Sequence, residues 1–567
     1  MADAAELARR IVQARGHTPA DLVIKNTRFL NVATGELVES DIAVCGDTIV
    51  GTYDRYDGTV EIDGRGMVCV PGFVDTHLHV ESSLVTPAEF DRCVLPRGTT
   101  TAICDPHEIA NVLGRAGLEY FLDSALGLAM DLRVQLSSCV PATTLETSGA
   151  RLEVGDLIPY REHPKVIGLA EFMNFPGVLA GDPGALAKLA AFSDRPIDGH
   201  APLVTGRDLN AYLACGIRTC HESTGLDEAR EKLRKGMQVL IRGGSTARDV
   251  DALAPLVDMT TSPHLAFCTD DRSPLDVVEE GHLDHTIRNA IARGALVAAV
   301  YRAATWSAAN AFGLRDRGLI APGQRADIVM LGDLAACGVE RVFKDGRPVG
   351  PDTFAGRPLV APVGRGSIRL DPVDPAVFRM PGGTGTVPVI GVIPGRILTD
   401  RLSAEVPVAA GERVADPSRD LLKVAVLARH GVNRNVGRAF VRGFGLHGGA
   451  LASSVGHDSH NVIVVGADDT DMAVAVNRLI EMQGGFVAAR GGRVLADLPL
   501  PIAGLMSDRP YEVVARRLAD LRRAVRSMGC HLPEPFLQLA FLPLPVIPHL
   551  KITDRGLVDV DRFELVA

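Results

Sequence analysis

The chain has 567 residues, which exceeds the size at which a single hydrophobic core stops growing, so two or three domains are expected. Hydrophobic residues make up 46% and charged residues 23%, an ordinary globular composition that excludes collagen-like, disordered and coiled-coil chains. The formal net charge of -10 disfavours nucleic-acid binding, which usually shows as clustered Lys and Arg. The expected partner is therefore a small molecule, with no nucleic acid.

The N-terminal residues include acids and lack the apolar region of a secretory signal, and there is no run of about 18 apolar residues that would span a bilayer. The 10 cysteines are scattered without a Cys-x-x-Cys pair, which argues against a zinc knuckle or a disulfide framework. We therefore expect most of these cysteines to be small residues of the hydrophobic core. We expect a cytoplasmic protein that does not bind a membrane.

Strand-like and helix-like patterns follow each other along the first half of the chain. Residues 21–70 form short strand-like segments between Gly and Asp, which predicts a small β module. From residue 66 to about 313, apolar runs alternate with Ala-, Leu- and Arg-rich stretches of helical length, the pattern of a parallel sheet. Eight such runs can be counted: 67–74, 99–104, 134–140, 166–172, 196–200, 217–221, 237–241 and 264–268. Eight parallel strands favour a (β/α)8 TIM-type barrel of the α/β class, with its active site at the strand C-termini.

The second half of the chain begins with strand-like segments up to about residue 363, which we expect to return to the first β module. A Pro- and Gly-rich stretch, 372–385, marks a linker. A C-terminal domain of mixed α/β character should follow, with helices over 469–483 and 510–528. The predicted domains are a small β-sandwich module from both flanks, the barrel and the C-terminal domain: 1–66 with 314–371, 67–313, and 387–567.

Two histidines, His77 and His79, end the first apolar run of the barrel region. The two-residue period of a strand sends both imidazoles to the same face, where they can bind one metal. A lone pair of this kind is more often a coincidence, but four later runs also end in a potential ligand: Glu171, His200, His221 and Asp270. Four histidines and two carboxylates exceed one zinc site and suit two divalent cations bridged by a carboxylate and a hydroxide.

These motifs resemble the amidohydrolase superfamily and, within it, the bacterial adenine deaminases, over nearly the whole chain. The segments that carry the resemblance are PGFVDTHLHVESS at 71–83, CDPHEIANV at 104–112, AEFMNFPGV at 170–178, DGHAP at 198–202 and CTDDR at 268–272. The first is superfamily-wide, and the others are narrower. In many relatives a carboxylated lysine bridges the metals, whereas the adenine deaminases use a glutamate. Glu171 stands at that place here, and Lys165 lies too far from the active-site end.

The resemblance implies a ligand set for two divalent ions. By position, His77 and His79 would bind the more buried ion, His200 and His221 the other, and Glu171 both. Manganese or iron is the expected metal, with zinc as an alternative, because histidine and carboxylate suit all three.

The resemblance also implies the acid–base groups. Asp270 would contact the metal and the bridging hydroxide, take the proton from the water and return it to the leaving amine, with Asp271 as the rival one position along. His107 and Glu108 are candidates for contacting the purine ring and protonating a ring nitrogen. The alternative is that this segment is only a helix N-terminus, with Asp105 as its cap and a proline at the first helical position.

Three further motifs are given structural interpretations. Residues 81–83 of the first loop favour capping over chemistry. The GHDSHN segment at 456–461 favours a polar turn between strands, although a role in closing over the substrate stays open. The segment 443–448 matches a dinucleotide-binding pattern formally, but the long helix that this pattern requires is missing, so no nucleotide cofactor is expected.

The resemblance implies hydrolytic deamination of adenine to hypoxanthine and ammonia, through attack of a metal-bound hydroxide on the ring carbon that bears the amine. Such an enzyme would serve purine salvage or adenine catabolism. The alternatives are a cyclic-amide hydrolase of the same superfamily and a non-catalytic scaffold that kept the barrel. We expect a homo-oligomer, a dimer, although the sequence fixes neither the oligomeric state nor the native metal.

Overall fold

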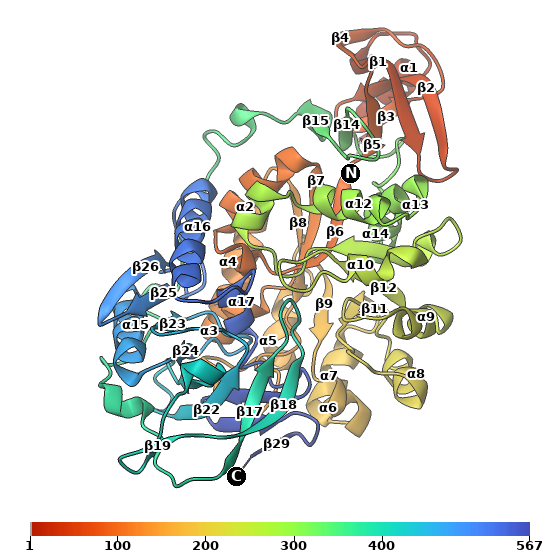
Figure 1. The fold of residues 1–567 in the computed structure, drawn as a ribbon. Helices are drawn as coiled ribbons and strands as arrows, with labels where there is room; N and C mark the ends of the chain where they lie inside the picture. Colours follow the sequence, from red (N-terminus) through yellow and green to blue (C-terminus); the bar gives the residue numbers. More distant parts are fainter. Residues whose placement is uncertain (1–2, 567) are drawn as a thin grey trace.

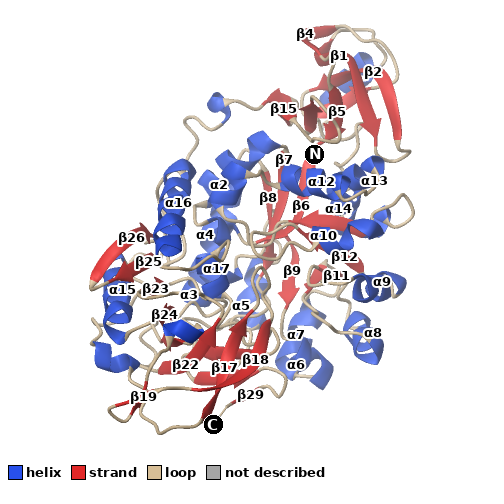
Figure 2. Cartoon of the chain, viewed as in Figure 1, coloured by secondary structure: helices blue, strands red, loops and turns tan. Residues whose placement is uncertain are grey.

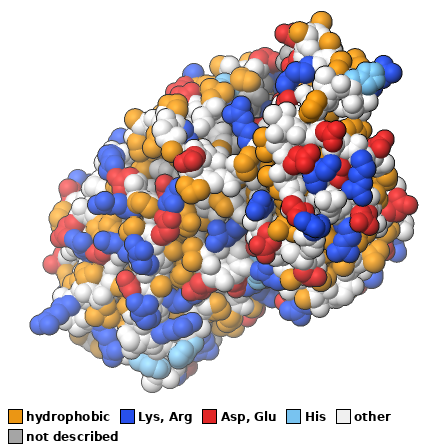
Figure 3. Space-filling model, turned by 90° about the horizontal axis from the view of Figure 1, so that it is seen from above, with side chains coloured by type: hydrophobic (Ala, Val, Ile, Leu, Met, Phe, Trp, Pro, Cys, Tyr) orange, Lys and Arg blue, Asp and Glu red, His pale blue; other side chains and the backbone are white. Residues whose placement is uncertain are grey.

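The computed structural model describes residues 3–566, which form parallel strands and helices between two larger mixed sheets (Figure 1). One mixed sheet lies at the N-terminal end of the molecule, and the other, built from the C-terminal part of the chain, lies at the opposite end. In the described range no helix is both long enough and apolar enough to cross a membrane. Acidic and basic side chains are interspersed over the face seen in Figure 3.

The first mixed sheet combines strands from both sides of the parallel region. Its members are β1 (Ala20–Asn31), β2 (Glu36–Cys45), β3 (Thr48–Gly51), β4 (Gly58–Asp63), β5 (Val68–Pro71), β14 (Ile328–Leu331), β15 (Val339–Lys344) and β16 (Arg347–Pro348). The two groups of strands meet where β5 pairs antiparallel with β14, with Val70 opposite Val329. The helix α1 (Ala4–Ala14), capped by Asp3, packs against β2 and β3.

The parallel strands carry the site. Five form one sheet, which contains β6 (Phe73–Leu78), β7 (Thr99–Cys104), β8 (Asp131–Leu136), β9 (Val166–Phe172) and β10 (Ile197–Gly199). Three form a second sheet, which contains β11 (Thr219–Cys220), β12 (Gln238–Arg242) and β13 (Leu265–Cys268). A parallel bridge between Leu78 and Asp270 brings the chain after β13 beside the end of β6, so the parallel sheet curls round. This is an α/β fold, and its strands are nearly all buried, as expected when helices cover a parallel sheet.

Helices follow the parallel strands and surround them (Figure 2). They are α2 (Pro87–Val94), α3 (His107–Leu113), α4 (Arg115–Leu126), α5 (Val154–Leu157), α6 (Phe175–Ala180), α7 (Pro183–Ala191), α8 (Gly206–Ala214), α9 (Leu226–Arg234), α10 (Val250–Leu253), α11 (Pro274–Glu279), α12 (Leu283–Ala292), α13 (Val297–Arg302) and α14 (Ala308–Ala311). Several begin at a side-chain cap followed by proline at the first helical position, as with Thr86, Asp182 and Ser273. The sequence therefore sets where these helices start.

The first predicted barrel strand, 67–74, is instead two strands in two different sheets. β5 belongs to the mixed sheet, and β6 begins only at Phe73 and carries the parallel pairing. Gly72 lies between the two strands. Glycine is needed there because a Cβ at this position would collide with the side chain of Thr100. The Pro71-Gly72 pair marks this break in the sequence, and the interpretation of 67–74 as one strand overlooked it.

The C-terminal part is mostly sheet, so the expected mixed α/β character is correct only in that helices are present. Its main sheet contains β17 (Thr386–Val392), β18 (Thr399–Glu405), β21 (Leu422–Leu427), β22 (Val436–Arg442), β23 (Ala450–Ser453), β24 (Val462–Gly466), β25 (Gly485–Arg490) and β26 (Arg493–Pro499). Smaller sheets contain β19 (Val408–Ala409), β20 (Glu412–Arg413), β27 (Leu550–Thr553), β28 (Gly556–Asp559) and β29 (Glu564–Leu565). The helices expected over 469–483 and 510–528 are confirmed as α15 (Asp469–Met482) and α16 (Tyr511–Ser527), and α17 (Pro535–Ala540) is additional.

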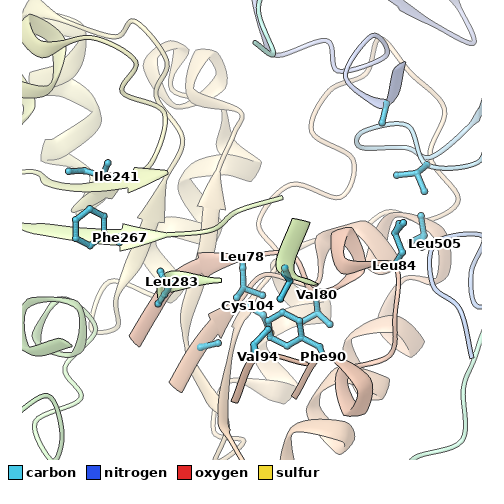
Figure 4. Packing of buried hydrophobic residues seen from close by; sticks show 14 of the residues in the cluster. Leu78, Val80, Leu84, Phe90, Val94, Cys104, Ile241, Phe267, Leu283 and Leu505 are labelled. Atoms are coloured by element: carbon cyan, nitrogen blue, oxygen red, sulfur yellow. The ribbon is translucent and has the colours of Figure 1, made fainter. Parts of the chain in front are cut away.

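One hydrophobic core runs from the parallel strands into the C-terminal part. Figure 4 shows Leu78, Val80 and Phe90 packed together beside the first strands, with Leu84 next to Leu505 of the C-terminal part. The amide of Ser507 donates to the carbonyl of Leu84 at 2.8 Å, which continues the contact through the backbone. The loop after β6 is therefore fixed against the C-terminal sheet.

Asp131, at the start of β8, is the centre of a buried charge cluster. Its carboxylate contacts Arg317 at 2.7 Å, Lys165 at 2.8 Å and Arg133 at 2.8 Å. Burial alone would raise the pKa of this carboxyl, but the three cations hold it well below its usual range. Asp131→Asn should lower the free energy of unfolding by about 3–5 kcal/mol, because the buried Arg317 guanidinium loses its buried partner and keeps only the half-exposed Asp316. Urea denaturation of both proteins at pH 7 measures the difference.

The same cluster predicts a pH dependence with a fixed sign. A carboxyl with a depressed folded-state pKa contributes stability that is present above its unfolded pKa of about 3.9 and is lost as the pH falls below it. The difference in free energy of unfolding between the wild type and Asp131→Asn should therefore become smaller below about pH 4. Asp63→Asn, on the exposed pair with Arg65, serves as the matched control and should change nothing measurable. If this difference in free energy of unfolding stays constant down to strongly acidic pH, ionised Asp131 is not the source of the stability.

Candidate metal centre and active site

His77 and His79 lie at the end of β6 with their ring nitrogens converging. The two Nε2 atoms are 3.3 Å apart, and both side chains are buried. The other ring nitrogen of each histidine forms a hydrogen bond. Nδ1 of His77 pairs with Asp198 Oδ2 at 2.8 Å, and Nδ1 of His79 pairs with the Asp105 carbonyl at 2.9 Å. Outer partners of this kind fix the ring orientation of metal-binding histidines and leave Nε2 free for a metal.

Glu171, at the end of β9, lies between two pairs of histidines. Its Oε1 is 3.5 Å from His77 Nε2 and 3.3 Å from His79 Nε2. Its Oε2 is 2.7 Å from His200 Nδ1 and 3.2 Å from His221 Nε2, where the chain leaves β10 and β11. Burial would raise the pKa of this carboxyl, but His221 and His77 hold it well below its usual range. One ionised carboxylate thus faces two imidazole pairs, a geometry that fits two neighbouring cations.

Asp270 completes this cluster from the chain after β13. Its Oδ1 is 3.2 Å from His79 Nε2, and its Oδ2 is 3.2 Å from Arg242 Nη1. Its backbone amide donates to the carbonyl of His77 at 3.0 Å, which fixes the residue beside β6. The rival, Asp271, lines the same cavity but accepts a hydrogen bond from the Ser82 hydroxyl. The structure therefore brings Asp270, and not Asp271, to the paired histidines.

Arg242 and Glu222 are buried charges of the site that the sequence reasoning missed. Arg242 Nη1 contacts Glu222 Oε1 at 2.5 Å, and Arg242 Nε contacts Asp249 Oδ2 at 2.9 Å. Burial would raise the pKa of Asp270, but the hydrogen bond from His79 and the charges of other neighbours, including Arg242, hold it well below its usual range. The signal was available, because Arg242 ends a strand and Glu222 directly follows His221.

Asp105 does not cap the helix α3, which was one of the two interpretations of its sequence segment. Pro106 stands at the N-cap of α3 without a side-chain hydrogen bond, and Asp105 Oδ2 instead pairs with His107 Nδ1 at 2.9 Å. Glu81 of the first loop supplies the capping interaction, since its Oε1 accepts from the Ile109 amide at 3.0 Å. The capping alternative is therefore wrong for Asp105, and His107 is oriented toward the cavity.

The turn between β23 and β24, where the sequence favoured a polar turn, places buried side chains at the cavity wall. His457 Nδ1 lies 2.6 Å from Glu108 Oε1, and His460 Nε2 contacts Glu108 Oε2. Asp458 Oδ1 is 3.6 Å from His107 Nε2. Burial would lower the pKa of His457, but the carboxylates of Glu108 and neighbouring acids raise it to about 9. Two histidines flanking an aspartate between buried strands were the signal that could have pointed here.

These groups line a cavity of about 30 Å³. Its wall is polar on the metal-binding side and apolar on the other, where four side chains contribute: Met173, Ile397, Phe541 and Leu544. The ring of Phe541 stacks on His457 with centroids 4.7 Å apart. Its lining, with a few placed polar groups opposite apolar side chains, is typical of sites that bind small molecules. Because the space itself holds little more than a water or two, a ligand has to move some of these side chains apart.

Two family models match the chain: the amidohydrolase family over residues 68–349, and the adenine deaminase C-terminal domain over residues 396–564. With the buried donor set described above, the first match defines an amidohydrolase, a metal-dependent hydrolase on an α/β fold. The adenine deaminase of Methylobacterium nodulans is 64% identical over 563 residues, 99% of this chain and 100% of that protein. That of Gluconobacter oxydans is 62% identical over 561 residues, 99% of each. The chain belongs to the adenine deaminase family.

Proposed function

We propose that this protein hydrolyses adenine to hypoxanthine and ammonia. The support is a family likeness that extends over the whole chain, together with a buried set of histidines and carboxylates at the wall of a small cavity. The observation that carries the site assignment is the position of Glu171, whose two oxygens face two separate histidine pairs.

The donor set suits two divalent ions. Among the described residues, five buried groups provide ligand atoms close enough to share a cation. Three of them consist of side chains at the strand ends: His77–His79–Asp270, His77–Glu171–His221 and His200–His221–Glu222. Imidazole and carboxylate donors fit manganese, iron and zinc, and the outer partners of His77 and His79 support metal binding. When bound, such ions supply Lewis acidity that brings the pKa of water toward neutrality. In this proposal Glu171 bridges the pair, with His77 and His79 on one side and His200 and His221 on the other.

Asp270 is proposed as the acid–base group. Its Oδ1 faces the paired histidines, where the attacking water must lie, and Arg242 keeps its Oδ2 ionised and oriented. The carboxylate can therefore accept the water's proton and return it to the departing amine. Hydrolysis then exchanges the amine of the substrate for an oxygen from water, with ammonia as the leaving group.

His107 and Glu108 are proposed to contact the ring. His107 lies between the metal ligands and the C-terminal turn, with Nδ1 at 3.6 Å from Glu171 Oε1. Burial would raise the pKa of Glu108, but His457, His460 and His107 hold it well below its usual range. The proton that Glu108 passes to a ring nitrogen as the amine carbon becomes tetrahedral must therefore first come from one of these histidines.

For the architecture, we propose that the two parallel sheets close into one (β/α)8 barrel. The bridge between Leu78 and Asp270 and the contacts between β10 and β11 support closure on both sides. The proposed domains are a β-sandwich module, the barrel and the C-terminal domain: 1–66 with 314–371, 67–313, and 387–567. We also propose, from the sequence, a cytoplasmic homodimer.

Metal-loaded protein should release ammonia from adenine in a panel that includes other aminopurines and cyclic amides. Hypoxanthine should form in equal amount, and prior dialysis against a chelator should abolish the reaction until a divalent metal is restored. Chromatography of the product together with an ammonia assay gives the measurement. Turnover of a cyclic amide without turnover of adenine would favour a cyclic-amide hydrolase, and turnover of no compound would favour a scaffold; either result overturns the proposal.

A further inference from the structure

Asp458 is a buried carboxylate that the proposed chemistry does not use. It comes from the turn between β23 and β24, and its side chain is only 2% exposed. Its Oδ2 finds no hydrogen-bond donor among residues 3–566, although Asp458 lines the active-site cavity. Buried carboxylate oxygens are costly to leave without a donor, so such an atom facing a cavity points to a ligand.

The position of Asp458 relative to the metal ligands is set by His107. One ring nitrogen of His107, Nδ1, lies 3.6 Å from Glu171 Oε1, and the other, Nε2, lies 3.6 Å from Asp458 Oδ1. The His107 ring therefore connects Asp458 to Glu171, and all three side chains line one cavity. A purine beside His107 with its amine carbon at the metal ligands would present its fused imidazole ring to Asp458.

An ionised carboxylate only accepts hydrogen bonds. Adenine offers two kinds of N–H donor, the exocyclic amine and the single imidazole N–H. The amine must lie beside Asp270 and the metal ligands, so the imidazole N–H is the donor left for Asp458. A nucleoside or any 9-substituted adenine has lost that N–H, and its remaining imidazole nitrogen is an acceptor that would face a buried anion.

We propose that Asp458, supplied by the C-terminal sheet, accepts the imidazole N–H of adenine and thereby selects the free base over its 9-substituted forms. This inference rests on the proposed function, since it assumes that the amine carbon lies at the metal ligands. Phe541, whose ring stacks on His457, and Ile397 line the same cavity and offer apolar surface to the purine plane. A site built around a ligand N–H rejects analogues without it, because its own polar group is then left unpaired.

The test compares adenine with 9-methyladenine, the smallest 9-substituted form, in the wild type and in Asp458→Asn. In Asp458→Asn, kcat/KM for adenine should fall roughly 10- to 100-fold, mainly through KM, because a charge-assisted hydrogen bond is lost. The preference for adenine over 9-methyladenine should shrink by a similar factor, since the amide can donate to the remaining imidazole nitrogen. Asp458→Glu keeps the carboxylate and should retain the preference for the free base.

Two controls make the outcomes distinct. Asp371→Asn, an exposed substitution of the same kind in the pair with Arg434, should leave both substrates unchanged. Calorimetry of purine against 9-methylpurine reads the same selectivity without turnover, so a slow variant remains informative. Elemental analysis should give equal metal contents for wild type and Asp458→Asn.

A wild type that does not deaminate adenine defeats the proposed function itself. A wild type that deaminates adenine, with an Asp458→Asn variant of unchanged selectivity in both turnover and calorimetry, defeats this inference alone. A further metal equivalent that is present in the wild type and lost in Asp458→Asn also overturns it. In that case Asp458 would be a ligand, with His107, Glu108 and His457, of an additional cation.

Discussion

Asp270→Asn should keep its metal and lose roughly 10²- to 10⁴-fold in kcat on adenine, the usual contribution of an acid–base group. The amide has the same shape, but it cannot take the proton from water or return it to the leaving amine. The loss should fall on kcat and kcat/KM together, because the missing interaction is made in the transition state. A larger loss is expected if the same carboxylate also orients the water.

Steady-state kinetics and elemental analysis on the same preparation check this result. Asp271→Asn is the matched control, since Asp271 lines the same cavity but pairs with Ser82. If Asp270→Asn turned over almost normally while Asp271→Asn was inactive with its metal intact, Asp271 would be the residue that transfers the proton. Normal turnover in both variants would overturn the acid–base assignment.

Glu171→Gln should lose metal as well as activity. The wild-type carboxylate offers one oxygen to each histidine pair, whereas the amide offers one weak acceptor and one donor that repels a cation. Changes to residues that only support a metal ligand cost about 10- to 100-fold, so replacement of the bridging ligand should cost at least that in metal affinity and activity.

Metal content after dialysis and turnover in excess metal are the two measurements. The wild type, purified under metal-replete conditions, should hold two divalent ions per chain. Glu162→Gln, in the exposed pair with Arg195, is the control and should have the metal content and turnover of the wild type. One ion or none in the wild type would contradict the two-metal site. Full metal retention by Glu171→Gln would contradict the bridging role alone.

The parallel strands and the metal-binding residues could be predicted because one simple rule governs both. Side chains at the C-terminal ends of parallel strands meet, so a ligand-type residue after each apolar run predicts a common site. His77, Glu171 and His221 follow this rule, and the structure places them in one cluster. The break between β5 and β6 was missed, although Pro71-Gly72 marks it, because the apolar residues on both sides suggested a single strand.

The contribution of the C-terminal part could not be predicted from spacing. Glu108 and His457 are separated by several hundred residues, and only the packing of the turn after β23 against α3 brings them to 2.6 Å. A polar turn is the ordinary explanation of such a segment, since turns favour Gly, Asp, Asn and Ser. What distinguishes this turn is burial, which a single sequence does not show.

The mixed sheet made from both flanks also limits when this protein can fold during synthesis. The hydrogen bonds of β5 to β14 join positions 71 and 328, so this pairing must wait until the whole parallel region has left the ribosome, whereas β1 to β5 can pair with one another earlier. At about 5–20 residues per second, that delay is on the order of tens of seconds. During this interval the apolar edge of β5 is exposed on the nascent chain. We therefore expect the early strands to depend on chaperones more than the late C-terminal sheet does.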